Sequence, residues 1–294
     1  MNYTDRYIGY LKKFVRSEKP FKVVFDASNG PAGKIIHGVL KDDSKITFEL
    51  INDDIDPDFT AHGPNPLAPG ASKQCAQKVI ATRADLGVIF DADGDRAIFL
   101  NNSGVIMEPY LILAILSKTT PGPYVVDEII YNCLNQMKLI SSDLLIQSKV
   151  GSYFIKEKIR EHNAQLGIEL SGHYYFKDFF NSDSGIVAAL KVIEALSRST
   201  DNQISQINHP KLILDELIVT NDLPWASIEA DLSKKFKETH NIRKLDGITV
   251  VGKNEWLNIR KSNTEPLLRI TGGGRELEAK KLIVDVKKII SESK

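Results

Sequence analysis

Short apolar runs alternate with amphipathic segments along most of this chain, a pattern typical of α/β proteins. Strands alternating with helices form parallel sheets with right-handed crossovers, so the first hundred residues predict one such domain. The expected strands there are Phe21 to Asp26, Ile46 to Ile51 and Val88 to Phe90, and the expected helices cover residues 7–15, 35–40 and 71–83.

A second alternating unit follows Pro121-Gly122-Pro123, where two prolines end any preceding helix and start an extended segment. Its similar order of elements leads to the hypothesis that the two units are distant structural repeats. The expected strands are Tyr124 to Asp127 and Leu144 to Gln147, and the expected helices cover residues 129–137, 154–160 and 184–197.

A polar stretch at residues 197–206, closed by Pro210, predicts a second linker. Beyond it the expected strands lie near residues 216–220, 248–251 and 256–259, and the expected helices lie near 226–236 and 279–289. We therefore predict three domains, residues 1–121, 122–200 and 201–294. The fold class is α/β, with two similar mixed or parallel α/β sandwich domains followed by a smaller α+β domain.

Three carboxylates follow the apolar run at residues 88–90, in the sequence Asp91-Ala92-Asp93-Gly94-Asp95-Arg96. Carboxylates that close repel one another, so a divalent cation among them would relieve the repulsion. Hard oxygen ligands on a tight loop favour Mg²⁺ over zinc. The fixed positive charge of Arg96 suits a phosphate oxygen or a carboxylate.

Two other interpretations of these aspartates need weighing. A calcium-binding EF-hand is excluded, because its glycine position would hold Arg96 and its bidentate glutamate position would hold Asn102. A solvated acidic turn stays open, since residues 97–100 and 105–107 predict the two strands of a hairpin.

Polar residues also alternate in Gly167-Ile168-Glu169-Leu170-Ser171-Gly172-His173. On an extended segment Glu169, Ser171 and His173 would present an acceptor, a hydroxyl and an imidazole toward one side. Gly172 would let a ligand approach the backbone closely. A structural histidine beside aromatic residues is the alternative.

Hydrogen-bond donors gather on a predicted turn that runs from Arg260 to Arg269. Each arginine can bind two phosphate oxygens at once, and the hydroxyls and the amide of the turn add further donors. The turn therefore predicts a phosphate site. The alternative is an exposed turn whose charges pair with Glu265 and with solvent.

Composition narrows the possible partners. The 294 residues include 38 basic and 38 acidic side chains, so charge gives no reason to expect nucleic acid or an anionic membrane as partner. Two distant cysteines, Cys75 and Cys133, indicate a reducing compartment. The longest apolar run, residues 110–116, falls short of the roughly 20 residues of a membrane span, and we expect a cytoplasmic protein.

The three loops in this order resemble those of the α-D-phosphohexomutases, closest to phosphomannomutase/phosphoglucomutase, and the similarity extends through Phe176-Lys177-Asp178 and Asp183-Ser184-Gly185. Family members have four domains around a deep cleft, and this chain resembles domains two to four. The resemblance implies that Mg²⁺ binds Asp91, Asp93 and Asp95, that Glu169 and Ser171 take sugar hydroxyls, and that His173 and Arg96 are catalytic, His173 assisting proton transfer. It implies that the phosphate not in transfer binds Arg260, Ser262, Asn263, Thr264 and Arg269.

The family reaction is a Mg²⁺-dependent interconversion of hexose 1-phosphates and hexose 6-phosphates, with mannose or glucose expected here, through a hexose 1,6-bisphosphate. Its phosphoryl donor is a phosphoserine in a Thr-Ala-Ser-His-Asn-Pro-like loop of the first domain, and these 294 residues contain no such loop. We therefore expect little or no turnover by this chain alone.

Two alternatives stay open beside a phosphohexomutase that lacks its first domain. The chain could bind phosphosugars without chemistry, or it could be the partner of a separately encoded phosphoserine-bearing domain. Apolar surface left by that domain would also favour self-association. A metal-dependent phosphatase is weaker, since no convincing nucleophile is present.

Overall fold

The computed structural model describes residues 2–198, 212–218, 224–262 and 267–293. Contacts divide the chain into two compact units. Within the described residues, one unit comprises 2–125, 143–146 and 155–198, and the other comprises 126–142, 147–154 and the C-terminal part. The strands form three sheets of five strands each in the part of the chain described.

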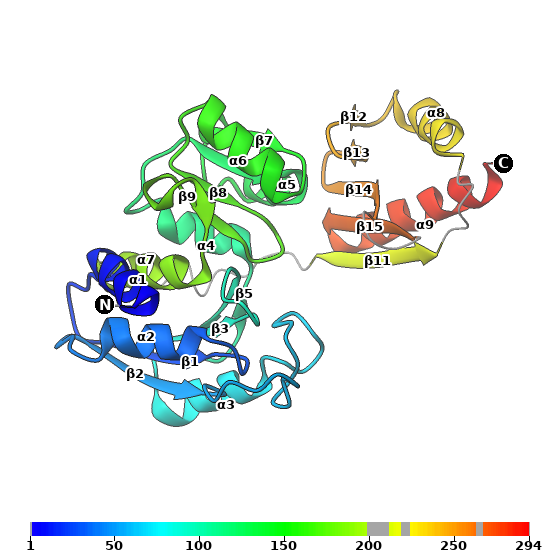
Figure 1. Ribbon diagram of the computed structural model, residues 1–294. Helices are drawn as coiled ribbons and strands as arrows, with labels where there is room; N and C mark the ends of the chain where they lie inside the picture. Colours follow the sequence, from blue (N-terminus) through cyan, green and yellow to red (C-terminus); the bar gives the residue numbers. More distant parts are fainter. Residues whose placement is uncertain (1, 199–211, 219–223, 263–266, 294) are drawn as a thin grey trace. The chain divides into compact units, whose positions relative to one another are not determined.

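The first sheet has the strand order β2-β1-β3-β4-β5. Strand β1 runs parallel to β2 and β3, whereas β4 and β5 are antiparallel additions. Helices α2 and α3 lie on opposite sides of this sheet (Figure 1). Helix α3 packs on β3, and α7 (Gly185–Arg198) packs on β3 and β4, which explains why these two strands are buried at every position. The elements are α1 (Tyr3–Leu11), η1 (Lys12–Phe14), β1 (Phe21–Asp26), α2 (Ala32–Leu40), β2 (Ile46–Ile51), α3 (Lys73–Thr82), β3 (Leu86–Phe90), β4 (Ala97–Asn101) and β5 (Ile106–Met107).

The second sheet, taken from β7, has the order β7-β6-β8-β9-β10, which repeats the order of the first sheet. The two sheets are therefore structural repeats, as the sequence suggested, and the β8–β9 hairpin corresponds to the β3–β4 hairpin. The elements are α4 (Pro109–Leu116), β6 (Tyr124–Asp127), α5 (Glu128–Met137), η2 (Ser142–Leu144), β7 (Leu145–Ser148), α6 (Ser152–Glu161), β8 (Leu166–Ile168), β9 (Tyr174–Phe176), η3 (Lys177–Phe179), β10 (Ser182–Asp183) and α7 (Gly185–Arg198).

The apolar run at residues 110–116 forms α4, whose residues are all buried. A helix that is apolar on all sides belongs in a protein core or a membrane. Each helix of the described residues is too short or too polar to span a bilayer. Helix α4 packs on β8 and α7, so this run is core.

The third sheet is antiparallel, with the order β11-β15-β14-β13-β12. Helices α8 and α9 bury apolar side chains against it in one core cluster that includes Ile228, Leu257 and Val286. The predicted fold class, two similar α/β domains and an α+β domain, is confirmed; the predicted boundaries at 121 and 200 stay a prediction. The elements are β11 (Ile213–Ile218), α8 (Trp225–Phe236), β12 (Asn241–Arg243), β13 (Ile248–Val251), β14 (Glu255–Lys261), β15 (Leu267–Gly274) and α9 (Glu276–Glu292).

The turn expected from Arg260 to Arg269 is longer than the connection between the two strands in the structure. Strand β14 continues to Lys261 and β15 begins at Leu267, so strand pairing takes up both ends of that stretch. The strand expected at residues 216–220 begins earlier, at Ile213, and residues 219 and 220 lie outside the described part.

Truncation of Leu257 tests the core of the α+β domain. Leu257 is 0% exposed and Leu277 is 80% exposed, so Leu257→Ala should lower the free energy of unfolding by about 2–5 kcal/mol and the control Leu277→Ala by less than about 0.5 kcal/mol. Both tryptophans of the chain, Trp225 and Trp256, lie in this domain, so urea denaturation followed by tryptophan fluorescence reports on it. Equal effects of the two substitutions would contradict the assigned core.

Candidate functional site

The metal loop, residues 91–96, joins β3 to β4 at the carboxyl end of a buried strand. Gly94 adopts the left-handed region at φ +79°, which allows the tight turn. One carboxylate oxygen from each of Asp91, Asp93 and Asp95 lies within 4.8 Å of the others. Such a set of oxygen donors fits a hard divalent cation.

Asp91 is the innermost of the three and is only 2% exposed. Its Oδ1 accepts hydrogen bonds from the backbone N–H groups of Gly94 (3.0 Å) and Arg96 (3.1 Å), and the Nε of Arg96 donates to Oδ2 at 2.6 Å. Burial disfavours the charge, but these contacts with Arg96 outweigh it and hold the pKa of Asp91 below its ordinary value. Of the two partners expected for Arg96, a phosphate oxygen or a carboxylate, the structure shows a carboxylate, that of Asp91.

The pKa of Asp95 is shifted in the opposite direction from that of Asp91. Partial burial, together with the nearby charges of Asp91, Asp93 and Asp183, raises the pKa of Asp95 to about 7. The loop therefore binds a proton near neutral pH at a position where a divalent cation would relieve the same repulsion.

The sugar loop, residues 169–173, forms the turn of the β8–β9 hairpin. The prediction of an extended segment is wrong, because the N–H of Gly172 donates to the carbonyl of Glu169 (3.1 Å) and the N–H of Glu169 to the carbonyl of His173 (3.1 Å). The turn still gathers the expected side chains. Ser171 Oγ lies 2.7 Å from Nδ1 of His173, and Oε2 of Glu169 lies 3.7 Å from the same nitrogen.

Glu169 is buried, and the hydroxyl of Tyr175 donates to its Oε2 at 2.6 Å. A hydrogen bond to a buried carboxylate fixes the side chain and satisfies one of its oxygens. Tyr175 thus holds Glu169 in place. Sequence reasoning did not single out Tyr175, although strand alternation places it two residues beyond His173.

The metal loop and the sugar loop meet within one compact unit. The backbone of Arg96 forms a β-bridge with that of His173, and the N–H of Ala97 donates to the carbonyl of Gly172 at 3.0 Å. His173 Nε2 lies 3.5 Å from Oδ1 of Asp95. Two loops that are far apart in sequence therefore form one polar site.

The structure adds Asp183 and Lys156 to this site. Single ligand atoms of Asp95, His173 and Asp183 lie within 4.8 Å of one another, and Lys156 Nζ lies 2.9 Å from Oδ1 of Asp183. The N–H of Gly185 donates to the carbonyl of Gly94 at 3.1 Å, which brings the start of α7 against the metal loop. Asp183 belongs to the Asp-Ser-Gly match noted in the sequence, whereas nothing there singled out Lys156.

The predicted phosphate site lies on the third sheet. Arg260 of β14 and Arg269 of β15 are directly opposite each other in the strand register. Two guanidinium groups at such positions could hold one anion between them through charge-assisted hydrogen bonds, and Glu216 of β11 is the residue opposite Arg269 on its other side. The N–H of Ser262 donates to the carbonyl of Leu267 at 2.9 Å, and the predicted ligands Asn263 and Thr264 lie outside the described residues.

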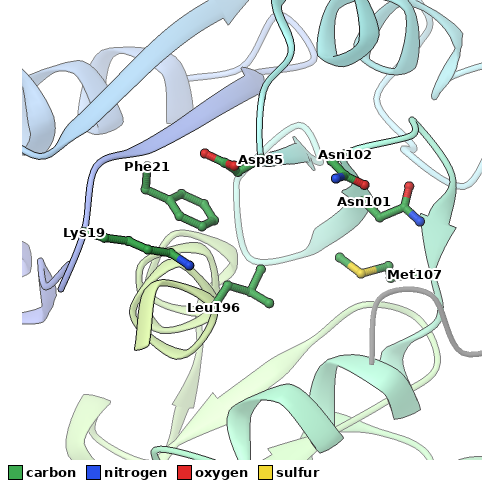
Figure 2. A pocket seen from close by; sticks show the side chains of 7 residues that line it. All are labelled: Lys19, Phe21, Asp85, Asn101, Asn102, Met107 and Leu196. Atoms are coloured by element: carbon green, nitrogen blue, oxygen red, sulfur yellow. The ribbon is translucent and has the colours of Figure 1, made fainter. Parts of the chain in front are cut away.

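A pocket at the other end of the first sheet serves as a contrast to the metal loop (Figure 2). Phe21 is the first residue of β1 and Asp85 precedes β3, so this pocket lies at the amino ends of these strands. Asp85 accepts a hydrogen bond from the N–H of Lys22, which is a local structural role. The lining residues are Lys19, Phe21, Asp85, Asn101, Asn102, Met107 and Leu196.

Two family models match consecutive parts of the chain. Residues 5–104 match "Phosphoglucomutase/phosphomannomutase, alpha/beta/alpha domain II", and residues 111–212 match domain III of the same family. The first match ends beyond the metal loop, and the second contains the sugar loop.

Similar proteins agree with these matches. The phosphomannomutase/phosphoglucomutase of Pseudomonas aeruginosa is 33% identical over 278 residues, which cover 90% of this chain and 59% of that protein. The crystal structure of a family protein from Burkholderia thailandensis superposes with a TM-score of 0.86 at 25% identity and covers 99% of this chain and 65% of that one. The chain thus spans less than two thirds of either protein's length.

A more distant solved structure shares the fold. It is the Aspergillus fumigatus N-acetylphosphoglucosamine mutase in complex with GlcNAc-6P and magnesium, with a TM-score of 0.67 at 14% identity over 98% of this chain and 70% of that one. The repeated sheets and the domain matches lead to one conclusion: this chain belongs to the phosphoglucomutase/phosphomannomutase family.

Proposed function

We propose that this chain carries the metal, sugar and phosphate loops of a phosphohexomutase, an isomerase that interconverts hexose 1-phosphates and hexose 6-phosphates of mannose or glucose. The observation that carries this proposal is the contact between the metal loop and the sugar loop, where His173 Nε2 lies 3.5 Å from Asp95 Oδ1. Phosphoryl transfer to a sugar hydroxyl needs charge neutralisation and proton transfer at one place, and these loops bring both together.

Mg²⁺ is the proposed cofactor, held by Asp91, Asp93 and Asp95. Their oxygens are hard ligands, and the raised pKa of Asp95 marks a position where positive charge is favoured. The Aspergillus fumigatus relative was solved with magnesium. When bound, the ion would neutralise charge on the phosphoryl group in transit.

Glu169, Ser171 and His173 are the proposed contacts to the sugar. Tyr175 fixes the Glu169 carboxylate, and a carboxylate is an acceptor that can orient a sugar hydroxyl. The Nδ1 of His173 faces Ser171 and its Nε2 faces Asp95, which suits the imidazole to holding or passing a proton beside the metal loop.

Arg260, Ser262 and Arg269, together with Asn263 and Thr264, are the proposed ligands of the phosphate that is not transferred. Two arginines directly opposite each other on neighbouring strands favour an anion between them. A phosphate held there would keep the sugar oriented while its other end reacts.

The phosphoryl donor is the part of the mechanism that these residues do not include. None of the 294 residues lies in a Thr-Ala-Ser-His-Asn-Pro-like loop, so we propose that turnover requires a phosphoserine from a separate domain. The second candidate function is a phosphosugar-binding protein without chemistry.

Ligand binding can be tested without the phosphoryl donor. Calorimetric titration of the purified chain with glucose 1,6-bisphosphate should show micromolar binding, and Arg260→Ala should weaken it by roughly 10- to 100-fold through loss of a charge-assisted bidentate contact. The control Arg275→Ala, an exposed arginine of the same domain, should bind like the wild type. Absence of binding by the wild-type chain would refute the phosphosugar site.

Turnover separates the two candidate functions. Glucose 1-phosphate should not be converted by the chain alone, and conversion should begin when a separately expressed phosphoserine-bearing domain of a family member is added. A coupled assay for glucose 6-phosphate measures both. Robust turnover by the chain alone would contradict the proposed requirement, and binding without rescue would establish the non-catalytic function.

Metal binding should depend on pH with a definite sign. Since Asp95 has a pKa of about 7 in the fold and takes up a proton below it, Mg²⁺ affinity should fall roughly tenfold between pH 8 and pH 6, with proton release on binding. The folded protein binds more protons than the unfolded chain in this range, so metal-free stability should also fall as pH rises.

Calorimetry in buffers of different ionisation enthalpy and melting temperatures at both pH values measure these effects. Asp95→Asn should remove the pH dependence and the stabilisation by Mg²⁺, whereas Asp58→Asn, at an exposed position outside the cluster, should keep both. Equal Mg²⁺ affinity of wild type and Asp95→Asn would rule out Asp95 as a ligand.

A further inference from the structure

A buried carboxylate lies at the carboxyl end of β1, beside β3, the strand that leads into the metal loop. Asp26 is 0% exposed, and its Oδ1 accepts hydrogen bonds from the N–H of Ser28 (3.0 Å) and from Nδ2 of Asn52 (3.0 Å). Nε2 of His62 lies 3.2 Å from the same oxygen, and the His62 side chain is 7% exposed. Oδ2 of Asp26 and Nδ1 of His62 are buried without a hydrogen-bond partner among the described residues.

Burial of such a pair is costly, so it needs a reason. His62 belongs to the long irregular stretch between β2 and α3, and Asn29 holds an earlier part of this stretch by hydrogen bonds. The side chain of Asn29 donates to the carbonyl of Asp54 at 3.0 Å and accepts from the N–H of Ala61 at 3.1 Å. Asp26 and His62 therefore fix the segment that follows Ala61.

One connection from Asp26 to the metal loop runs through Ser28. The Asp26 carboxylate holds the N–H of Ser28, whose backbone has φ +49°, and the Ser28 hydroxyl donates to the carbonyl of Phe90 at 2.5 Å. Phe90 is the residue before Asp91. The carboxylate on β1 therefore fixes the entry into the metal loop.

A second connection runs through His62. Two residues further on, the carbonyl of Pro64 accepts a hydrogen bond from the N–H of Ala92 at 3.2 Å. The turn after β1 also packs directly on Ala92, since a Cβ on Gly30 would lie 2.2 Å from its carbonyl oxygen. Phe90 and Ala92, the residues on both sides of Asp91, are thus held in place by contacts that lead back to the Asp26–His62 pair.

We propose that Asp26 and His62 are positioning residues for the metal site: the buried pair locks the chain on both sides of Asp91 and so sets where that carboxylate lies. The inference rests on the proposed metal-binding function and deepens it. Burial keeps both side chains from substrate, so they act through the loop and not on the reacting atoms. Residues that orient metal ligands typically change metal affinity when they are replaced.

Mn²⁺ is a suitable probe, because carboxylate sites that bind Mg²⁺ also take this paramagnetic ion. Titration of the full chain, followed by electron paramagnetic resonance of the unbound ion, gives the Mn²⁺ dissociation constant. His62→Ala should raise it by roughly tenfold or more. His62→Gln, whose amide nitrogen can replace Nε2 as donor to Asp26, should recover most of the affinity.

Two further variants separate positioning from general stability. Ser28→Ala removes only the hydroxyl that holds the Phe90 carbonyl, so it tests the other connection even where His62→Ala fails to fold, and it should also raise the dissociation constant. His37→Ala is the matched control, since this histidine is exposed on α2 of the same domain and should leave the constant unchanged.

The possible outcomes distinguish a failure of the positioning role from a failure of the proposed metal-binding function. Wild-type binding of Mn²⁺ that is lost in Asp93→Asn, with equal constants in His62→Ala, Ser28→Ala and wild type, would overturn the positioning role and leave the metal site standing. Lower melting temperatures with unchanged Mn²⁺ constants would also overturn it. Wild-type protein that does not bind Mn²⁺ would overturn the metal site on which the inference depends.

Discussion

Three carboxylates confined to one short turn repel one another, and the surrounding structure depends on how that repulsion is met. Arg96 secures the charge of Asp91 through two hydrogen bonds, whereas Asp95 keeps a raised pKa. Backbone hydrogen bonds from Gly185 to the turn, and from Ala97 at its end to Gly172, hold it on two sides. The result is a rigid concentration of negative charge whose natural counterpart is a divalent cation.

Repetition of one fold explains how the metal loop and the sugar loop come together. Both sit at the tip of the same hairpin in two sheets with the same strand order, β3–β4 in one and β8–β9 in the other. A single scaffold thus presents a charged turn and a hydrogen-bonding turn to each other, with His173 beside Asp95. Loop chemistry, and not the shared scaffold, distinguishes their roles.

The sequence predicted correctly those elements that the local pattern of apolar and polar residues is enough to define. The strand from Phe21 to Asp26 was placed at both ends, because a short apolar run between polar turns has few alternatives. Strand β15 was missed, since Thr271 and three glycines after it resemble a loop, and only pairing with β14 and β11 makes them a strand. The turn at residues 169–173 looked extended for a related reason, because a chain reversal is decided by pairing and not by alternation.

The candidate site was predictable where its residues are neighbours in sequence. Asp91, Asp93 and Asp95 lie within five positions, so their spacing favoured a metal loop, with a solvated acidic turn as the alternative. The contact of Asp26 with His62 joins residues 36 positions apart, and no pattern along the chain reveals it. Such supporting contacts belong to the tertiary structure, which is why the sequence predicted the candidate ligands but not the contacts that support them.

The most direct test of this account is where a metal ion binds. Crystals of the chain soaked in MnCl₂ would give an anomalous difference map that locates manganese independently of any activity. We predict one strong peak bound by oxygens of Asp91, Asp93 and Asp95. A peak held instead by His173 and Asp183, or none on this loop, would contradict the claim that the three carboxylates form the metal site.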